Sequence, residues 1–213
     1  MALTATHLRF ALEMKDALQV QHLEQYLSGA MYPDSRYFTG VAREVTHDES
    51  LFSGDVLTMD DFHKGWAMHL ACDRFQGEAM KQLFSEEASL TKPGEEGWIF
   101  RTALKVLQDI DDAKQFDANR FVRMMTWYQS PYGNETSEQL EQYFGLYRDL
   151  YVSGDVTIEE EMAVWVKAGM DEKLVDRVKE KAYRMKETPQ DMERVGQLFA
   201  LSLKDSFSKT QEH

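Results

Sequence analysis

The sequence contains very little cysteine, proline and glycine. Cys72 is the only cysteine, and this excludes a disulfide bond within the chain. Four prolines and twelve glycines in 213 residues leave long stretches without a helix breaker, which favours long helices. Apolar residues make up 43% of the chain, so a sizeable buried core is expected rather than disorder.

Positive charge and long apolar runs are also scarce. A formal net charge of -13 disfavours broad binding to nucleic acid or to an anionic membrane surface. A small phosphorylated substrate stays compatible with this charge, because a bound divalent cation can reverse the local field. No run approaches the roughly eighteen apolar residues of a membrane segment. The N-terminus carries Glu13 and lacks the continuous apolar core of a signal peptide, so the cytoplasm is the expected location.

Apolar residues recur at helical spacing along most of the chain, and they predict an all-α fold, a multi-helix bundle. The predicted helices cover residues 6–18, a second stretch to residue 27 that Gly29 ends, and then residues 41–46, 60–84, 98–109, 116–127, 137–152, 157–168, 171–185 and 189–206. A break at residues 91–97 separates a region 1–90 with the candidate site from a helical half 98–213, which we expect to pack into the same domain.

Two similar segments predict how two of these helices begin. SGDVLTMDDF at 53–62 resembles SGDVTIEEEM at 153–162, and each precedes a helix that contains tryptophan. Thr58 and Thr157 are the predicted N-caps, because threonine followed three residues later by an acidic residue is typical of a capping box. The second copy has no counterpart of His69 or Asp73.

The helix at 60–84 places His69 and Asp73 on its aromatic face. The two residues are four positions apart, so their side chains lie one above the other. An isolated carboxylate buried there would cost several kcal/mol. Either a hydrogen bond or a nearby arginine such as Arg43 or Arg74 compensates it, or a divalent metal does, since imidazole nitrogen and carboxylate oxygen are both suitable ligands.

Three polar residues upstream favour the metal. Taken singly, His7 on an apolar helix face is more often a core histidine, Asp34 after proline an Asx-turn and His47 a surface residue. Their occurrence just ahead of the HxxxD pair favours a shared site.

This series resembles a known family. His7, GAMYPD ending in Asp34, His47, and FHKGWAMHLACD ending in Asp73 are similar to the zinc-dependent phospholipase C family over about residues 5–80. The resemblance implies an all-helical fold in which Asp34, His47, His69 and Asp73 bind one zinc. His7 would help to bind a second zinc, bridged by Asp73. No histidine lies between His69 and His213, so one or two ions are implied rather than three.

A second resemblance competes with the first. His7, the adjacent pair His47–Asp48 and the distant Asp73 are similar to the HD phosphohydrolase pattern, which belongs to helical, cytoplasmic, metal-dependent enzymes that cleave phosphate esters. Both resemblances predict a metal among the same few residues.

The expected function is therefore a metal-dependent hydrolase, a phosphoesterase that acts on a small phosphorylated substrate. Zinc is the first choice of metal, with iron and manganese as alternatives. Asp34, or Asp48 in the HD pattern, is the candidate general base. Arg36, Arg43 and Tyr32 are candidate substrate contacts, the arginines through phosphate oxygens.

The alternative comes from another class of protein. A helical binding or scaffold protein would keep the fold, with or without a structural metal. Residues 125–151 are rich in tyrosine, and the C-terminal helices offer a surface for a partner or a homo-oligomer.

Overall fold

The computed structural model describes residues 3–52, 55–87, 92–127 and 132–210. Within these ranges the regular structure is helical and no strand occurs, which confirms the predicted all-α fold. The α-helices are α1 (Thr4–Met14), α2 (Leu23–Met31), α3 (Arg36–Thr39), α4 (Arg43–Thr46), α5 (Asp61–Leu83), α7 (Glu95–Ala113), α8 (Ala118–Val122), α9 (Ser137–Leu150), α10 (Ile158–Lys167), α11 (Glu172–Lys186) and α12 (Pro189–Thr210). Short 3-10 helices lie between them: η1 (Tyr32–Ser35), η2 (Glu49–Phe52), η3 (Val56–Thr58) and η4 (Tyr151–Ser153).

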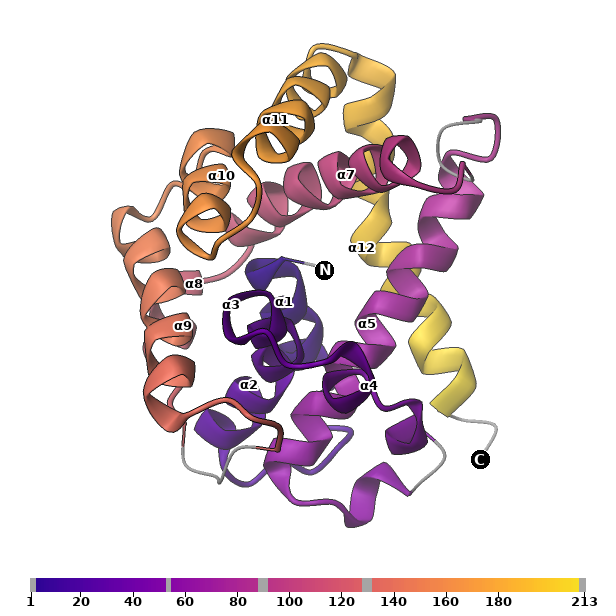
Figure 1. The fold of residues 1–213 in the computed structure, drawn as a ribbon. Helices are drawn as coiled ribbons and strands as arrows, with labels where there is room; N and C mark the ends of the chain where they lie inside the picture. Colours follow the sequence, from indigo (N-terminus) through magenta and orange to yellow (C-terminus); the bar gives the residue numbers. More distant parts are fainter. Residues whose placement is uncertain (1–2, 53–54, 88–91, 128–131, 211–213) are drawn as a thin grey trace.

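Helix α1 lies in the middle of the molecule, with α5, α7 and α9 around it (Figure 1). Its first five residues, Thr4 to Leu8, are all buried, so the helix is covered on every side at this end. A helix buried all round is the centre of a core rather than a surface element. One continuous hydrophobic cluster runs from Leu3 to Phe199 and packs around it. None of the described helices combines the length and the apolar character needed to cross a membrane.

Helices α2 and α5 approach each other very closely through two glycines. A Cβ on Gly29 would lie 1.9 Å from the carbonyl oxygen of Phe62, and a Cβ on Gly65 would lie 1.9 Å from that of Tyr26. Backbone therefore packs against backbone at this crossing. The prediction that Gly29 ends the helix is wrong: α2 continues through it to Met31, because the missing side chain serves the close approach rather than a C-cap.

The two similar segments start their helices differently. Thr157 caps α10 as predicted, in a capping box with Glu160. The predicted cap at Thr58 is wrong, because Asp60 accepts the hydrogen bond from the backbone N–H of His63 instead. Thr58 lies in η3 and donates its hydroxyl proton to the carbonyl oxygen of Asp55.

Two other helices differ in length from the prediction. Helix α1 ends at Met14, not near Leu18, and the chain then turns through a left-handed residue, Gln19. The helix predicted at 116–127 is only α8, which begins after the cap Asp117 and ends at Val122. Beyond it, the backbone N–H of Thr126 donates to the side-chain oxygen of Ser28, and this tertiary hydrogen bond replaces a further turn of helix.

Candidate metal centre

The structure brings together the five predicted ligands from four parts of the chain. His7 comes from the central α1, and Asp34 from η1 directly after α2. His47 is the C-cap of α4, while His69 and Asp73 lie one turn apart on α5. All but Asp73 are buried, and the side chain of Asp73 is 19% exposed. The cluster therefore meets the surface at Asp73.

Three of these residues form a group that can hold a metal ion. Nε2 of His69 and Nε2 of His47 each lie 3.8 Å from Oδ2 of Asp73. The three ligand atoms are all within 4.8 Å of one another. A point equidistant from three atoms so spaced lies roughly 2.2–2.5 Å from each, close to the ~2.0–2.2 Å bonds of zinc to imidazole nitrogen and carboxylate oxygen. A contraction of a few tenths of an ångström would complete the bonds.

A second group shares His69 with the first and consists of His7, Asp34 and His69. Nε2 of His69 is 3.9 Å from Oδ1 of Asp34, and Nε2 of His7 is 3.9 Å from Oδ2 of the same carboxylate. Nε2 of His69 is therefore flanked by one oxygen of Asp34 and one of Asp73. A single ring nitrogen has one lone pair, so His69 joins the two groups but can bind one ion at a time.

The backbone fixes which nitrogen of His69 faces the cluster. Nδ1 lies 2.8 Å from the carbonyl oxygen of Ala30, and a carbonyl oxygen can only accept, so Nδ1 carries the proton. Nε2 then presents its lone pair toward Asp34 and Asp73. A hydrogen bond from the second ring nitrogen to a backbone carbonyl is typical of histidines that bind metal. Ala30 reaches this position because its neighbour Gly29 lets α2 approach α5.

His47 is oriented in a similar way by its neighbour. Nδ1 of His47 lies 3.0 Å from the hydroxyl oxygen of Thr46, whose own proton is directed at the carbonyl oxygen of Arg43. The hydroxyl then accepts from Nδ1 and leaves Nε2 of His47 unprotonated. Nε1 of Trp66 donates to the carbonyl oxygen of Thr46 at 2.7 Å, which ties the end of α4 to α5. Trp66 thus holds the backbone beside His47.

His7 has no hydrogen-bond partner among the described residues at either ring nitrogen. Its ring stacks on that of His69 with the centroids 3.8 Å apart and the planes 18° from parallel. Burial, together with the neighbouring His69, holds the pKa of His7 well below its usual value. A buried neutral imidazole with two unsatisfied nitrogens is costly unless something binds it.

Burial sets the charge of the other ligands too. It lowers the pKa of His69 to about 4 and also lowers the pKa of His47, so both rings are neutral at pH 7. Burial raises the pKa of Asp34. It would raise the pKa of Asp73 as well, but nearby positive charge, that of Lys105 foremost among the side chains, holds that pKa well below its usual value. Neutral imidazoles beside an ionised carboxylate are the protonation states that a metal requires.

Lys105 is the residue of this site that the sequence did not reveal. Its Nζ lies 3.1 Å from Oδ1 of Asp73, the carboxylate oxygen that faces away from the two histidines. Lys105 belongs to α7 and stands 32 positions after Asp73, so no local spacing relates them. The sequence predicted that a hydrogen bond, an arginine or a metal compensates the charge of Asp73, and the structure adds a lysine to these.

The other predicted site residues lie outside the two groups. Asp48 is exposed and accepts a hydrogen bond from the backbone N–H of Ser50, so it does not join the cluster. Tyr32 is completely buried among aromatic side chains and donates its hydroxyl proton to Glu135, and this burial argues against the predicted substrate contact. His63 on α5 also lies outside the two groups: its Nδ1 is 2.9 Å from Asp60 and its Nε2 is 3.1 Å from the hydroxyl of Tyr132.

Arg36 and Arg43 differ from the ordinary surface arginine of this acidic chain. Arg36 is half-buried with its guanidinium 4.6 Å from the ring centre of Tyr37, and Arg43 is exposed. Neither forms an ion pair with any residue that the structure describes. Burial and Asp34 raise the pKa of Tyr37 to about 12, and the charges of Arg36 and Arg43 oppose this rise.

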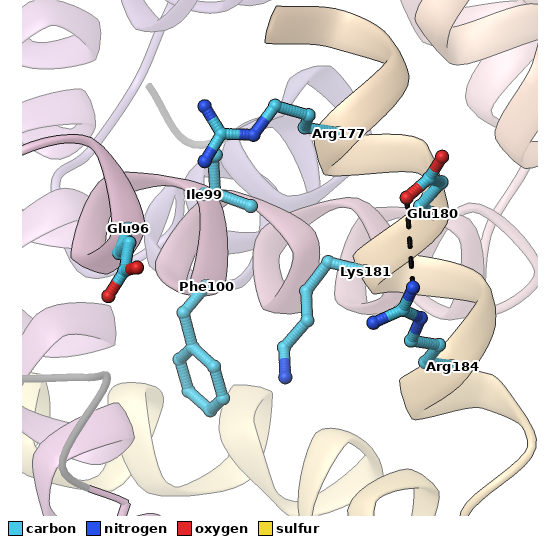
Figure 2. Close-up of a pocket in the computed structure, with 7 residues that line it drawn as sticks. All are labelled: Glu96, Ile99, Phe100, Arg177, Glu180, Lys181 and Arg184. Atoms are coloured by element: carbon cyan, nitrogen blue, oxygen red, sulfur yellow. Dashed lines mark ion pairs between the residues drawn. The ribbon is translucent and has the colours of Figure 1, made fainter.

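A groove on the surface of the molecule lies apart from this chemistry. It occupies about 340 Å³ between α7 and α11, and its floor is formed by Ile99 and Phe100 (Figure 2). Nζ of Lys181 lies 4.8 Å from the ring centre of Phe100, and Arg184 pairs with Glu180 at 3.8 Å. None of the predicted ligands lines this groove, and its basic side chains are largely balanced by acidic ones.

No family model matches the chain, and neither a curated protein nor a solved structure was found to be similar to it. The geometry of the His/Asp cluster is therefore the basis for the functional proposal.

Proposed function

We propose that the cluster is a divalent metal centre and that the protein is a metal-dependent hydrolase of phosphate esters. One observation carries the metal: four residues from separate elements direct buried, unpartnered polar atoms at each other. These atoms are Nδ1 and Nε2 of His7, Oδ1 of Asp34, Nε2 of His47 and Nε2 of His69. Buried polar atoms are nearly always hydrogen-bonded, so these atoms need partners. The two ring nitrogens of His7 point away from each other, so only one of them can share a partner with the other residues. A cation is the partner that lone pairs of imidazole and carboxylate share.

Zinc fits this donor set best. Mixed imidazole and carboxylate ligands suit zinc, while iron and manganese accept the same groups. The single cysteine, Cys72, is buried and belongs to neither group, so no thiolate is needed. The two groups share His69, and this arrangement supports one ion or two ions close together, as the phospholipase-like resemblance implies.

Hydrolysis is supported by the one edge of the cluster that reaches the surface, at Asp73, whose side chain is 19% exposed. A bound divalent ion supplies Lewis acidity and lowers the pKa of a bound water. Asp34, with a raised pKa and an oxygen that no described residue satisfies, is placed to take a proton. Arg36 follows Asp34 by two residues, and Arg43 begins the short helix that His47 caps. Neither has an acidic partner among the described residues, and a phosphate oxygen is a ligand that such guanidinium groups prefer.

A structural metal in a non-catalytic protein is the second candidate. It is favoured by the burial of His7, Asp34 and His69, since a substrate has no access to a fully enclosed group. The group of His47, His69 and Asp73 is the one nearer the surface, and a catalytic ion belongs there. Metal binding and hydrolysis are therefore tested separately.

Elemental analysis of protein purified without chelator tests the metal. We expect at least one zinc, iron or manganese ion per chain in the wild type and far less in the H69A/D73A double variant. The matched control is His63→Ala, which removes an exposed histidine of the same helix and should leave the metal content unchanged. Wild-type protein with well under one ion per chain, and no uptake of added zinc, manganese or iron, would rule the centre out.

A substrate panel tests the hydrolase. We expect the metal-loaded protein to hydrolyse at least one of the p-nitrophenyl phosphate monoesters and diesters, phosphocholine esters or nucleotides, and to lose this activity in the double variant. Stoichiometric metal without any hydrolysis across the panel would favour the structural role.

A further inference from the structure

Helix α7 carries no candidate ligand, but a row of polar side chains on it contacts α5, which carries His69 and Asp73, and α1, which carries His7. Lys105 reaches Asp73 on α5, and one turn further on Gln108 accepts a hydrogen bond of 2.8 Å from the side-chain amide of Gln76. Asp109 and Asp112, another turn along, bind α1 at Thr6, the residue before His7. Burying a row of polar side chains costs free energy of folding unless hydrogen bonds or ion pairs compensate it.

Hydrogen bonds compensate the burial of Asp109 and Asp112. The carboxylate of Asp109 accepts from the backbone N–H of Thr6 at 2.8 Å and from the hydroxyl of Tyr151 at 2.9 Å. Asp112 accepts from the hydroxyl of Thr6 at 2.8 Å and from Arg9 at 2.6 Å. Three of these four hydrogen bonds fix the start of α1, the fourth ties Asp109 to Tyr151, and together they give the two acids a structural role.

Lys105 differs because its partner is itself a ligand. The ammonium group holds Oδ1 of Asp73, whereas Oδ2 of the same carboxylate is the atom that faces His47 and His69. The Lys105 side chain is 13% exposed, so the pair is only partly screened by water. One carboxylate thus lies between a fixed positive charge and the position proposed for the metal.

We propose that Lys105 is a positioning residue that limits Asp73 to one coordinating oxygen and lowers the affinity of the centre for its cation. The inference rests on the proposed metal centre. Because the ammonium occupies Oδ1, only Oδ2 is directed at the ion, and a coordination position is left open for a water or a substrate oxygen. Because the ammonium is positive and lies a few ångströms from that ion, it repels the ion directly.

A charge effect of Lys105 and a purely structural effect change the zinc affinity in opposite directions when the lysine is removed. If Lys105 only supported the fold around Asp73, its removal would weaken metal binding. If its charge opposes the cation, removal should strengthen binding, since Asp73 then offers both oxygens and the ion replaces the missing counter-charge. We expect Lys105→Met to bind zinc at least tenfold more tightly than the wild type. Lys105→Arg, which keeps the charge, should bind within about threefold of the wild type.

Competition of the full-length protein with a fluorescent zinc chelator measures this affinity without any enzymatic assay. Lys64→Met is the matched control: Nζ of Lys64 lies 3.2 Å from Oδ1 of Asp61, and both side chains are buried. Asp61 lies on α5 two turns before His69, so this variant removes a similar pair without touching the ligands. It should leave zinc affinity unchanged.

Each outcome separates this inference from the proposed function. If Lys105→Met and Lys105→Arg both bind zinc no more tightly than the wild type, the proposed role of Lys105 is wrong, while the proposed metal centre is unaffected. A wild-type protein that binds no zinc overturns the centre itself. If Lys105→Met does not fold, Lys105→Gln takes its place in the experiment. We again expect at least tenfold tighter zinc binding, and unchanged or weaker binding would contradict the role of Lys105.

Discussion

His69 donates its Nδ1 proton to the carbonyl oxygen of Ala30 across the crossing of α2 and α5. This one hydrogen bond determines that Nε2 of His69 is the free nitrogen of the candidate centre. It depends on backbone positions rather than on a second side chain, so the distance between the two helices controls the chemistry of the histidine.

The first prediction concerns the glycine that permits this crossing. Gly29→Ala places a Cβ 1.9 Å from the carbonyl oxygen of Phe62, so the helices must separate. We expect a loss of about 3 kcal/mol of unfolding free energy or more, measured by urea denaturation, and weaker zinc binding because Ala30 moves from His69. Gly77→Ala on α5 is the control, since nothing lies within 4 Å of its Cβ. It should stabilise the protein by up to ~1 kcal/mol, and equal effects of the two variants would contradict this account.

The second prediction separates the two family resemblances. Asp34→Asn should lower zinc affinity by about a hundredfold or more, because it removes a buried carboxylate whose oxygens lie 3.9 Å from Nε2 of His7 and Nε2 of His69. Asp48→Asn should change the affinity by less than twofold, because Asp48 only caps the turn at Ser50. Isothermal titration of both variants with zinc provides the comparison. A large loss in Asp48→Asn alone would support the HD-like arrangement instead.

The third prediction is the pH dependence of metal binding. Protons compete with a metal for imidazole, and burial has lowered the pKa of His69 to about 4 and that of His47 below its usual 6.5. Protonation of these two histidines should therefore lower zinc affinity by less than about tenfold between pH 7 and pH 5.5. A site of exposed histidines would already lose about tenfold per histidine over that range. A steep decline that begins near pH 6.5 would show that the rings are not buried as described.

The fourth prediction uses Glu161, a completely buried acid whose two carboxyl oxygens have no hydrogen-bond partner among the described residues. Burial raises its pKa well above 4.5, and the nearby Asp109, whose own pKa burial raises to about 7, adds to the rise. At Glu161 the folded protein therefore holds its proton more tightly than the unfolded chain above pH 4.5, and the contribution of this residue to stability falls as the pH rises from there.

Glu161→Gln removes the part of this fall that is due to Glu161, because the amide is neutral at every pH. We expect the variant to be more stable than the wild type at pH 8 in the presence of EDTA, with a smaller difference at pH 5. Urea denaturation at four pH values between 5 and 8 measures this. The exposed Glu193→Gln should follow the wild-type curve at each pH, and a Glu161→Gln curve parallel to that of the wild type would refute the prediction.

The sequence predicted the helical fold and the pair His69 and Asp73 from local spacing, whereas His7, Asp34 and His47 were predicted from their order along the chain and from the family resemblance. The separation of His69 and Asp73 by one helical turn places them on one face whatever the rest of the chain does. Thr157 and Asp60 show the limit of this reasoning. The capping-box motif correctly predicted Thr157 as the N-cap of α10, but for α5 it predicted Thr58, whereas the N-cap is Asp60.

What the sequence could not predict arises from contacts between distant segments. Lys105 contacts Asp73 because α7 packs against the core, and no sequence pattern near either residue predicts this contact. Tyr32 looked like a pocket residue beside Asp34, but Glu135, 103 positions away, binds its hydroxyl inside the aromatic cluster. Asp48 adjoins His47 in sequence, yet the end of α4 directs the histidine inward and leaves the aspartate at the surface.

The hydrogen bonds from Asp109 and Asp112 to Thr6 also set the order in which the protein can be assembled. They join residues 103 and 106 positions apart, so closing this loop is a late and entropically costly event in folding. On a ribosome that adds about 5–20 residues per second, His7 is made roughly 5–20 seconds before the helix that fixes it in place. The last of the five candidate ligands, Asp73, is also made before α7. The complete set of candidate ligands is therefore synthesised before the helix whose hydrogen bonds fix the start of α1.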